Sequence, residues 1–280
     1  MLAVGLGLLV AATYGAGDFL GGLASRRRSA TLVVLWSQAA GLGGLLLLVP
    51  FLGGSPSGRD LGLGVAAGLI GLCGVLLLFR GLALGRMSVV APVTAVGAAF
   101  VPFFWGVADG EGLPATRLVG AVLALAGVAL VSQGHGHPVE EAEESAVVDL
   151  VLALGAGIAF GLVFVILARL GHEAGLWPVL TQRAASVPTL LVAATVAGVP
   201  RRASRTDLRL IVPAGLCDAG ANALFVVAAR TGALSVVGVV SSLYPAATVL
   251  LAALVLKERV TGSQGIGLFM AGAGVVLLAL

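Results

Sequence analysis

The sequence contains a long internal repeat. Residues 60–130 align with residues 207–277 at one constant offset, without a gap, and about twenty of about seventy aligned pairs are identical. Polar and acidic residues are among the matches: Asp60 with Asp207, Ser88 with Ser235, and Glu111 with Glu258. Because shared apolar composition does not produce matched acidic residues, we interpret the chain as one structural unit that occurs twice.

Composition places this unit in a lipid bilayer. Hydrophobic residues make up 59% of the chain and charged residues only 10%, and the mean hydropathy is +1.11. A membrane-spanning helix needs about 20 apolar residues, and its backbone must be hydrogen-bonded within the segment. The apolar runs show no alternation, which favours helices over strands. The net charge of +3 comes from arginines at the ends of the runs. It therefore bears on orientation and does not indicate a nucleic-acid partner.

The apolar runs predict an all-α integral membrane protein with ten transmembrane helices. The predicted spans are residues 2–24, 31–53, 61–84, 88–108, 116–133, 148–170, 175–198, 208–230, 234–256 and 261–280. A hydrophilic, glutamate-rich linker, 134–147, separates a first repeat, 1–133, from a second, 148–280. Because five is an odd number, the second repeat is expected to be inverted in the membrane. Alternating-access transporters are built in this way, with a site near the midplane.

Few residues suggest metal or cofactor chemistry. Cys73 and Cys217 each lie within an apolar run, and His135 and His137 lie in the hydrophilic linker. Two isolated thiols provide neither a disulfide framework nor a metal site, so we expect no metal and no cofactor. We also expect that the chain is not an enzyme.

Several short motifs carry a family resemblance. Leu243-Tyr244-Pro245 is followed by the segment from Leu256 to Thr261, by Gly267 and by Ala273-Gly274-Val275, with weaker echoes at Ala91-Pro92-Val93, Glu111 and Gly120. With these motifs and the repeat, the chain resembles the ten-helix EamA-type permeases of the drug/metabolite transporter superfamily. The resemblance implies that helices 1–4 and 6–9 surround a central cavity. It also implies that helices 5 and 10 lie at the periphery, where they would form a homodimer surface.

Four of the charged residues in the predicted spans stand out, namely Asp18, Arg80, Arg183 and Asp218. A charge in the hydrocarbon costs about 2.5–3.5 kcal/mol on insertion scales, so each is a candidate functional residue. Their depths allow an Asp18–Arg80 pair and an Arg183–Asp218 pair. Such pairs would either clamp helices together or respond to protons, cations or substrate. Arg80 is near a span end and can snorkel, which favours clamping.

Polar and aromatic residues complete the predicted substrate site. It comprises Tyr14, Asp18, Gln38, Thr94, Gln182, Arg183, Asp218, Asn222 and Tyr244. Pro92, Pro102 and Pro245 predict bending in spans 88–108 and 234–256, although fitting the shape of the bundle explains them equally well.

Other motifs indicate helix ends and helix packing. Glu111 and Glu258 precede the fifth and tenth spans, where a carboxylate complements the positive end of the next helix. Thr261 and Gln264 have the spacing of a capping box. Small residues predict close helix contacts: Gly120, Ala124 and Gly127 in one span, and Gly267, Ala271 and Gly274 in another.

We predict an inner-membrane, multi-pass carrier that exports small metabolites or drug-like solutes, with a proton as its possible coupling ion. The alternatives are an uptake permease, a passive channel, and an intramembrane aspartyl protease. The protease would use Asp18, in Gly15-Ala16-Gly17-Asp18, together with Asp218. The repeat is not explained by a protease. The arginine-rich loops predict that both termini lie outside, whereas the resemblance implies that they lie in the cytoplasm.

Overall fold

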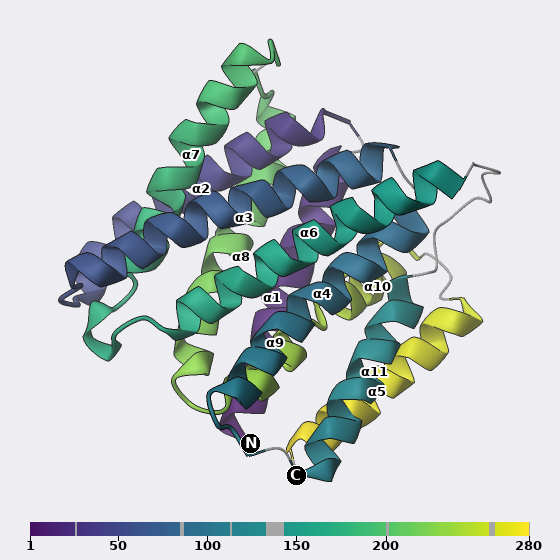
Figure 1. The fold of residues 1–280 in the computed structure, drawn as a ribbon. Helices are drawn as coiled ribbons and strands as arrows, with labels where there is room; N and C mark the ends of the chain where they lie inside the picture. Colours follow the sequence, from purple (N-terminus) through teal and green to yellow (C-terminus); the bar gives the residue numbers. More distant parts are fainter. Residues whose placement is uncertain are drawn as a thin grey trace.

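Helices form all of the regular secondary structure that the computed structural model describes, which covers residues 1–25, 27–84, 87–112, 114–132, 143–199, 202–257 and 261–279. The elements are α1 (Leu2–Ser25), α2 (Ala30–Leu52), α3 (Gly58–Leu84), α4 (Met87–Ala108), α5 (Ala115–Ser132), α6 (Glu143–Ala168), a 3-10 turn (His172–Ala174), α7 (Trp177–Val196), α8 (Arg205–Ala229), α9 (Leu234–Ser241), α10 (Tyr244–Val255) and α11 (Gly262–Ala279) (Figure 1).

Many of these helices are suited to a bilayer. Seven segments of the described chain are long and apolar enough to cross it: Leu2–Ser25, Ala30–Leu52, Gly58–Leu78, Leu150–Ala168, Trp177–Val196, Arg205–Ala229 and Leu234–Val255. Three apolar helices are shorter: Val93–Ala108, Ala115–Val131 and Gly262–Leu278. The protein is therefore a multi-pass membrane protein. The count of ten spans and the inversion of the two repeats stay predictions.

Two helix boundaries differ from the sequence prediction. Helix α6 begins at Glu143, inside the predicted linker 134–147. The predicted span 234–256 consists of two helices, α9 and α10, separated by a turn at Ser242 and Leu243. Pro245 lies in the first turn of α10, where backbone N–H groups have no partner within the helix, so its missing N–H removes no helix hydrogen bond.

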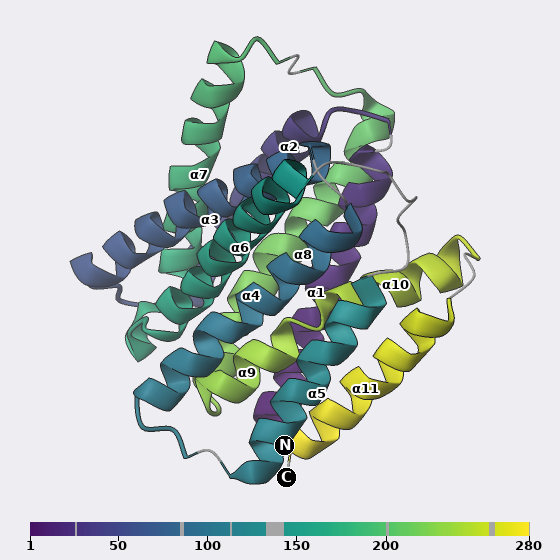
Figure 2. The same ribbon diagram turned by 45° about the vertical axis from the view of Figure 1, so that its right-hand side comes forward.

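Helices α5 and α11 lie side by side at one edge of the molecule, as both ribbon views show (Figure 2). Their small residues face each other. A Cβ atom at Gly127 would lie 2.6 Å from Gly267 O, and one at Gly274 would lie 2.6 Å from Gly120 O. The predicted close helix contact is confirmed, and it joins two helices of one chain. The homodimer through these helices stays a prediction.

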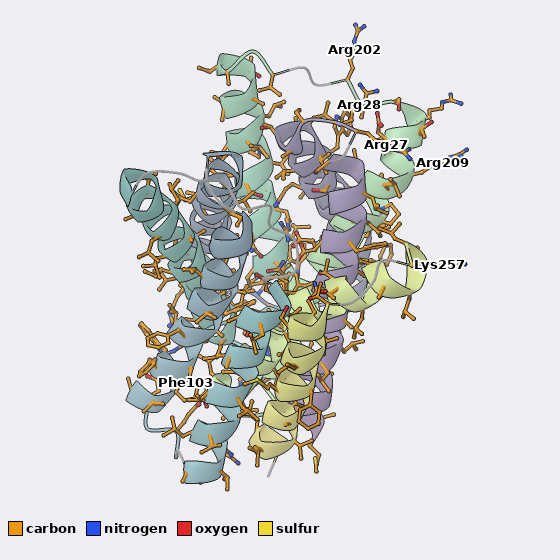
Figure 3. The ribbon with its side chains drawn as sticks, turned by 90° about the vertical axis from the view of Figure 1, so that its right-hand side faces the viewer. Arg27, Arg28, Phe103, Arg202, Arg209 and Lys257 are labelled. Atoms are coloured by element: carbon orange, nitrogen blue, oxygen red, sulfur yellow. The ribbon has the colours of Figure 1, made fainter. Side chains whose placement is uncertain are left out.

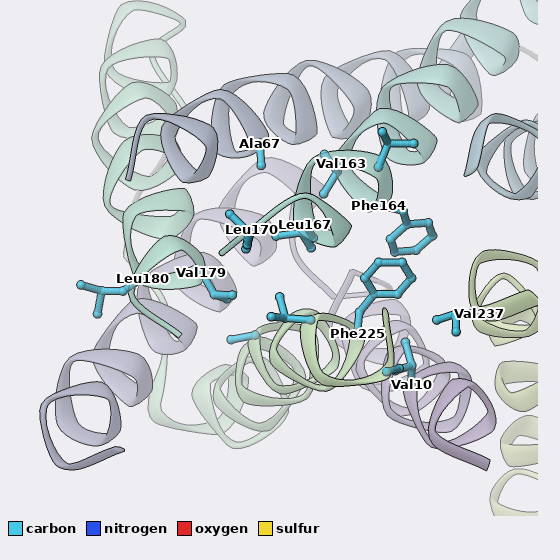
Figure 4. Packing of buried hydrophobic residues seen from close by; sticks show 14 of the residues in the cluster. Val10, Ala67, Val163, Phe164, Leu167, Leu170, Val179, Leu180, Phe225 and Val237 are labelled. Carbon is cyan, nitrogen blue, oxygen red and sulfur yellow. The ribbon is translucent and has the colours of Figure 1, made fainter. Parts of the chain in front are cut away.

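The other helices pack mainly against partners from the opposite part of the chain. Helix α1 contacts α8, α9 and α10; α2 contacts α7 and α8; α3 contacts α6 and α7; α4 contacts α6 and α9. Stacked Phe164 and Phe225, with Val10 and Val237, lie in the largest buried cluster (Figure 4). The bundle is thus interleaved and does not divide into two separate five-helix bodies.

The two ends of the bundle differ in the residues they hold. The termini end holds both chain termini and the starts of α3, α5 and α9 (Figure 1). The arginine-rich end holds the end of α1 and the start of α8. Arg27, Arg28, Arg202 and Arg209 gather there, at the opposite end of the molecule from Phe103 (Figure 3).

Candidate functional site

Arg183 is the centre of a polar cluster among apolar helices. It lies on α7, and its side chain is only 5% exposed. Its Nη2 atom lies 2.5 Å from Oδ2 of Asp218 on α8, whose side chain is 40% exposed. The predicted Arg183–Asp218 pair is therefore present. A buried guanidinium needs such a partner, because an unpaired charge in an apolar interior is strongly destabilising.

Helix α2 contributes the second partner of Arg183. The Nη1 atom of Arg183 donates to Gln38 Oε1 at 2.5 Å, and Ser186 Oγ donates to the same oxygen at 2.9 Å. Helices α2 and α8, which carry the two partners of Arg183, lie close together because Gly215 packs against the backbone of Ser37. The guanidinium is thus held in place by α2 and α8 together.

Gln182 and Asn222 extend the cluster along α7 and α8. Gln182 Nε2 donates to Asn222 Oδ1 at 3.4 Å, and Asn222 Nδ2 donates to Asp218 O at 2.9 Å. Two buried atoms of the cluster have no hydrogen-bond partner, Gln182 Oε1 and Arg183 Nε. Buried polar atoms are rarely left unpaired, so these two are available to water or to a polar ligand. One is an acceptor and the other is a charged donor.

Asp18 lies on α1, beside the cluster, and its side chain is exposed. The two glycines before it let α1 approach its neighbours. A Cβ atom at Gly15 would lie 2.6 Å from Ala247 Cβ on α10, and one at Gly17 would lie 3.2 Å from Ala214 O on α8. The predicted Asp18–Arg80 pair lies outside the described residues, because the side chain of Arg80 is not among them.

Aromatic side chains connect α10, α1, α6 and α8. The ring of Tyr14 lies 6.2 Å from that of Tyr244 and 6.1 Å from that of Phe164, measured between centroids. Phe164 stacks on Phe225 at 4.4 Å. The Tyr14 hydroxyl also lies within electrostatic range of Asp18, Asp218 and Arg183. An aromatic surface therefore adjoins the polar cluster, and such a combination can bind a ligand with apolar and polar parts.

Thr94 has a different environment from the other predicted site residues. It is buried, and its Oγ1 atom donates to Ala153 O at 3.2 Å, which ties α4 to α6. Three residues of the site were not predicted: Ser186 in the polar cluster, and Phe164 and Phe225 in the aromatic surface. Ser186 could have been found, because it lies one helical turn after Gln182 and Arg183 on the same face. The two phenylalanines carry no such signal in an apolar sequence.

Glu111 has a different partner from the predicted one. It was expected to complement the helix that follows it, α5, but its carboxylate accepts from the N–H groups of Leu234 at 2.6 Å and Ser235 at 3.0 Å. These groups begin α9, in the other repeat. The predicted capping box is confirmed: Thr261 N donates to Gln264 Oε1, and Gln264 N donates to Thr261 Oγ1. Glu258 lies outside the described residues.

Residue groups suited to a metal ion are not found in the described part of the chain. Cys73 and Cys217 are free thiols. His135 and His137 lie outside the described residues.

Comparisons with known proteins agree on the class of the chain. The profile of the EamA-like transporter family matches residues 1–133 and 149–280. Among curated proteins, none matches the sequence. A solved structure described only as a crystal structure of a protein is similar with a TM-score of 0.78 and 17% sequence identity. That match covers 98% of this chain and 95% of the other. At this identity, the likeness concerns the fold alone.

Proposed function

Because the chain belongs to the EamA-like transporter family, we propose that it is a secondary transporter. It exports small metabolites or drug-like solutes across the cell inner membrane, by alternating access between two inverted five-helix repeats. The observation that carries the proposal is the polar cluster around Arg183, which lies among apolar helices and keeps unpaired buried atoms.

The substrate site lies between the polar cluster and the aromatic surface. Arg183 Nε and Gln182 Oε1 offer a donor and an acceptor, and Tyr14 and Tyr244 offer ring faces. Gln38, Asp218 and Asn222 hold these groups in position, and Asp18 adds a negative charge at the edge. The substrate class that fits is a small molecule with an apolar or aromatic part and at least one hydrogen-bonding group.

The site is tested by ligand binding and flux. Purified protein is screened by thermal shift against amino acids, nucleosides, amines and drug-like compounds, and the hits are then measured for uptake into proteoliposomes. We expect Arg183→Gln to reduce saturable flux at least tenfold, while the exposed Arg202→Gln leaves it unchanged. Saturation and counterflow indicate a carrier. Equal flux in Arg183→Gln, or linear flux without counterflow as in a passive channel, contradicts the proposal.

Proton coupling depends on Asp18 and Asp218. A carboxylate that faces the site can exchange a proton for a substrate contact, so Asp18→Asn or Asp218→Asn is expected to flatten the pH dependence of flux. Asp109→Asn, at the termini end, serves as the matched control. Wild-type pH profiles in both site variants would reject the coupling while leaving transport intact.

The direction of transport and the membrane orientation are separate measurements. Inside-out vesicles that accumulate the substrate support export over uptake. We propose that both termini lie outside, because the arginines gather at the opposite end and arginine-rich loops face the cytoplasm. A C-terminal reporter that is active only in the cytoplasm would overturn this orientation.

The protease alternative has less support from the geometry. Asp218 pairs with Arg183, whereas an aspartyl dyad needs two carboxylates that share a proton. The glycines before Asp18 have a packing role against α8 and α10. Cleavage of membrane peptides by the purified protein, lost in Asp18→Asn, would restore this alternative.

A further inference from the structure

A second candidate site lies at the arginine-rich end, away from the polar cluster. It is an open groove with a volume of about 530 Å³ between the ends of three helices. Its lining residues are Leu23, Arg27, Thr206, Arg209, Leu210 and Leu256. The six comprise two guanidinium groups, one hydroxyl and three leucines. The groove is therefore amphipathic.

The groove is formed where three helices begin or end. Arg27 follows the end of α1, Thr206 and Arg209 lie in the first turns of α8, and Leu256 follows the end of α10. Since these helices belong to segments long and apolar enough to cross the bilayer, we expect the groove at their ends to face the lipid headgroup region.

Arg27 and Arg209 are the basic residues of the groove lining. The labelled side chains of Arg202 and Lys257 lie further away, above and below these two in the view of Figure 3. The nearby carboxylate of Asp207 is already bonded, since it accepts from Ser204 N, from Ser204 Oγ and from Arg28 Nε. Within the described part of the chain, no ion pair involves the side chain of Arg27 or Arg209, so both can meet an external anion.

The apolar surface continues outwards from the groove. Leu254 is 76% exposed and Val255 is 60% exposed at the end of α10, directly before the lining residue Leu256. Surface of this kind suits hydrocarbon chains and not water. A soluble anion would use only the arginines, whereas a phospholipid would use the arginines and the leucines together.

We propose that this groove binds an anionic phospholipid of the surrounding bilayer. The phosphodiester lies between Arg27 and Arg209, whose guanidinium groups match phosphate oxygens in geometry, and an acyl chain lies along Leu210 and Leu256. The bound lipid connects α1, α8 and α10. These helices also carry Asp18, Asp218 and Tyr244. The proposal does not depend on transport.

The test uses the full-length protein in detergent, titrated with phosphatidylglycerol, phosphatidylcholine or inorganic phosphate. Native mass spectrometry measures lipid retention, and thermal shift measures stabilisation. We expect phosphatidylglycerol to be retained and to raise the melting temperature, with little effect of the other two. Each arginine near the membrane surface contributes about fivefold in affinity, so Arg27→Gln/Arg209→Gln weakens phosphatidylglycerol binding about 25-fold.

The matched control is Arg202→Gln/Lys257→Gln, which removes the same charge outside the groove lining and is expected to retain the lipid. The single variants Arg27→Gln and Arg209→Gln, each weakened about fivefold, give the answer if the double variant does not fold. Unchanged phosphatidylglycerol binding in the groove variants, or equal loss in the control, would overturn the proposal. Equal stabilisation by inorganic phosphate would identify a soluble-anion site instead.

Discussion

Asp60 and Asp207 occupy equivalent positions in the two copies of the sequence repeat and build the same helix cap, yet they bond to different partners. Asp60 Oδ2 accepts from Ser57 N at 3.0 Å, and Asp207 Oδ2 accepts from Ser204 N at 2.9 Å. Both aspartates then reach across to the other part of the chain. Asp60 accepts from the backbone N–H of Gly171 at 2.8 Å, whereas Asp207 accepts from Arg28 Nε at 2.8 Å.

The partners differ in how firmly they are held. The partner of Asp60 is the backbone N–H of Gly171, and the carbonyl oxygen of Gly171 in turn accepts from Arg230 Nη2 at 2.8 Å. Arg28 is a flexible side chain that is 45% exposed. Further cross-chain contacts secure the termini end: Arg169 pairs with Asp109, Glu111 caps α9, and Ser55 N donates to Glu173 O. Of the two contacts, the pair of Asp207 with Arg28 is therefore expected to break at the lower cost under the proposed mechanism.

The largest effect on stability is expected when Asp60 is replaced, compared with the same replacement at Asp207. Asp60→Ala removes a helix cap and leaves Gly171 N without its acceptor, so we expect a loss of about 2 kcal/mol of stability. At this chain length the midpoint of thermal unfolding falls by about 5 °C. Asp207→Ala, the matched control, removes an equivalent cap and an ion pair to the half-exposed Arg28, and is expected to shift the midpoint less. Equal shifts would show that the two ends are equally secured.

A smaller effect is expected from Glu111→Gln. A glutamine has one acceptor oxygen and no charge, so only one of the two N–H groups at the start of α9 keeps a good partner. We expect a loss of about 1 kcal/mol and faster hydrogen exchange at Leu234 and Ser235. Glu173→Gln, an exposed change at the same end, is expected to alter neither. Unchanged exchange at the start of α9 would remove Glu111 from the contacts that secure this end.

The smallest effect is expected from Arg28→Gln. The Arg28 side chain is 45% exposed, so its pair with the buried Asp207 is still screened by salt, and the melting curve should shift slightly at low salt and not at high salt. Arg202→Gln, an exposed arginine at the same end, is the control for the change in net charge. A large, salt-independent shift would show that Arg28 secures the arginine-rich end as firmly as Gly171 secures the other.

The sequence predicted one capping box and the packing motifs, but not the repeated caps at Asp60 and Asp207 and not every partner. The Thr261–Gln264 capping box and the contacts of small residues between α5 and α11 are confirmed, because both depend on spacing within a helix. Glu111 was assigned to the wrong helix, because its partner lies more than a hundred residues away and carries no mark in the sequence. The predicted span 234–256 was expected to bend at Pro245, but it divides into two helices before Tyr244.

The sequence by itself determined that this is a helical multi-pass membrane protein of a transporter family, because hydropathy and local motifs act over a few turns of helix. Only the tertiary structure decided that Gln38 also binds Arg183, and that Phe164 and Phe225 extend the aromatic surface. Those contacts depend on how helices from opposite parts of the chain are rotated against one another. Packing sets that rotation, and in so apolar a sequence many faces of a helix look alike.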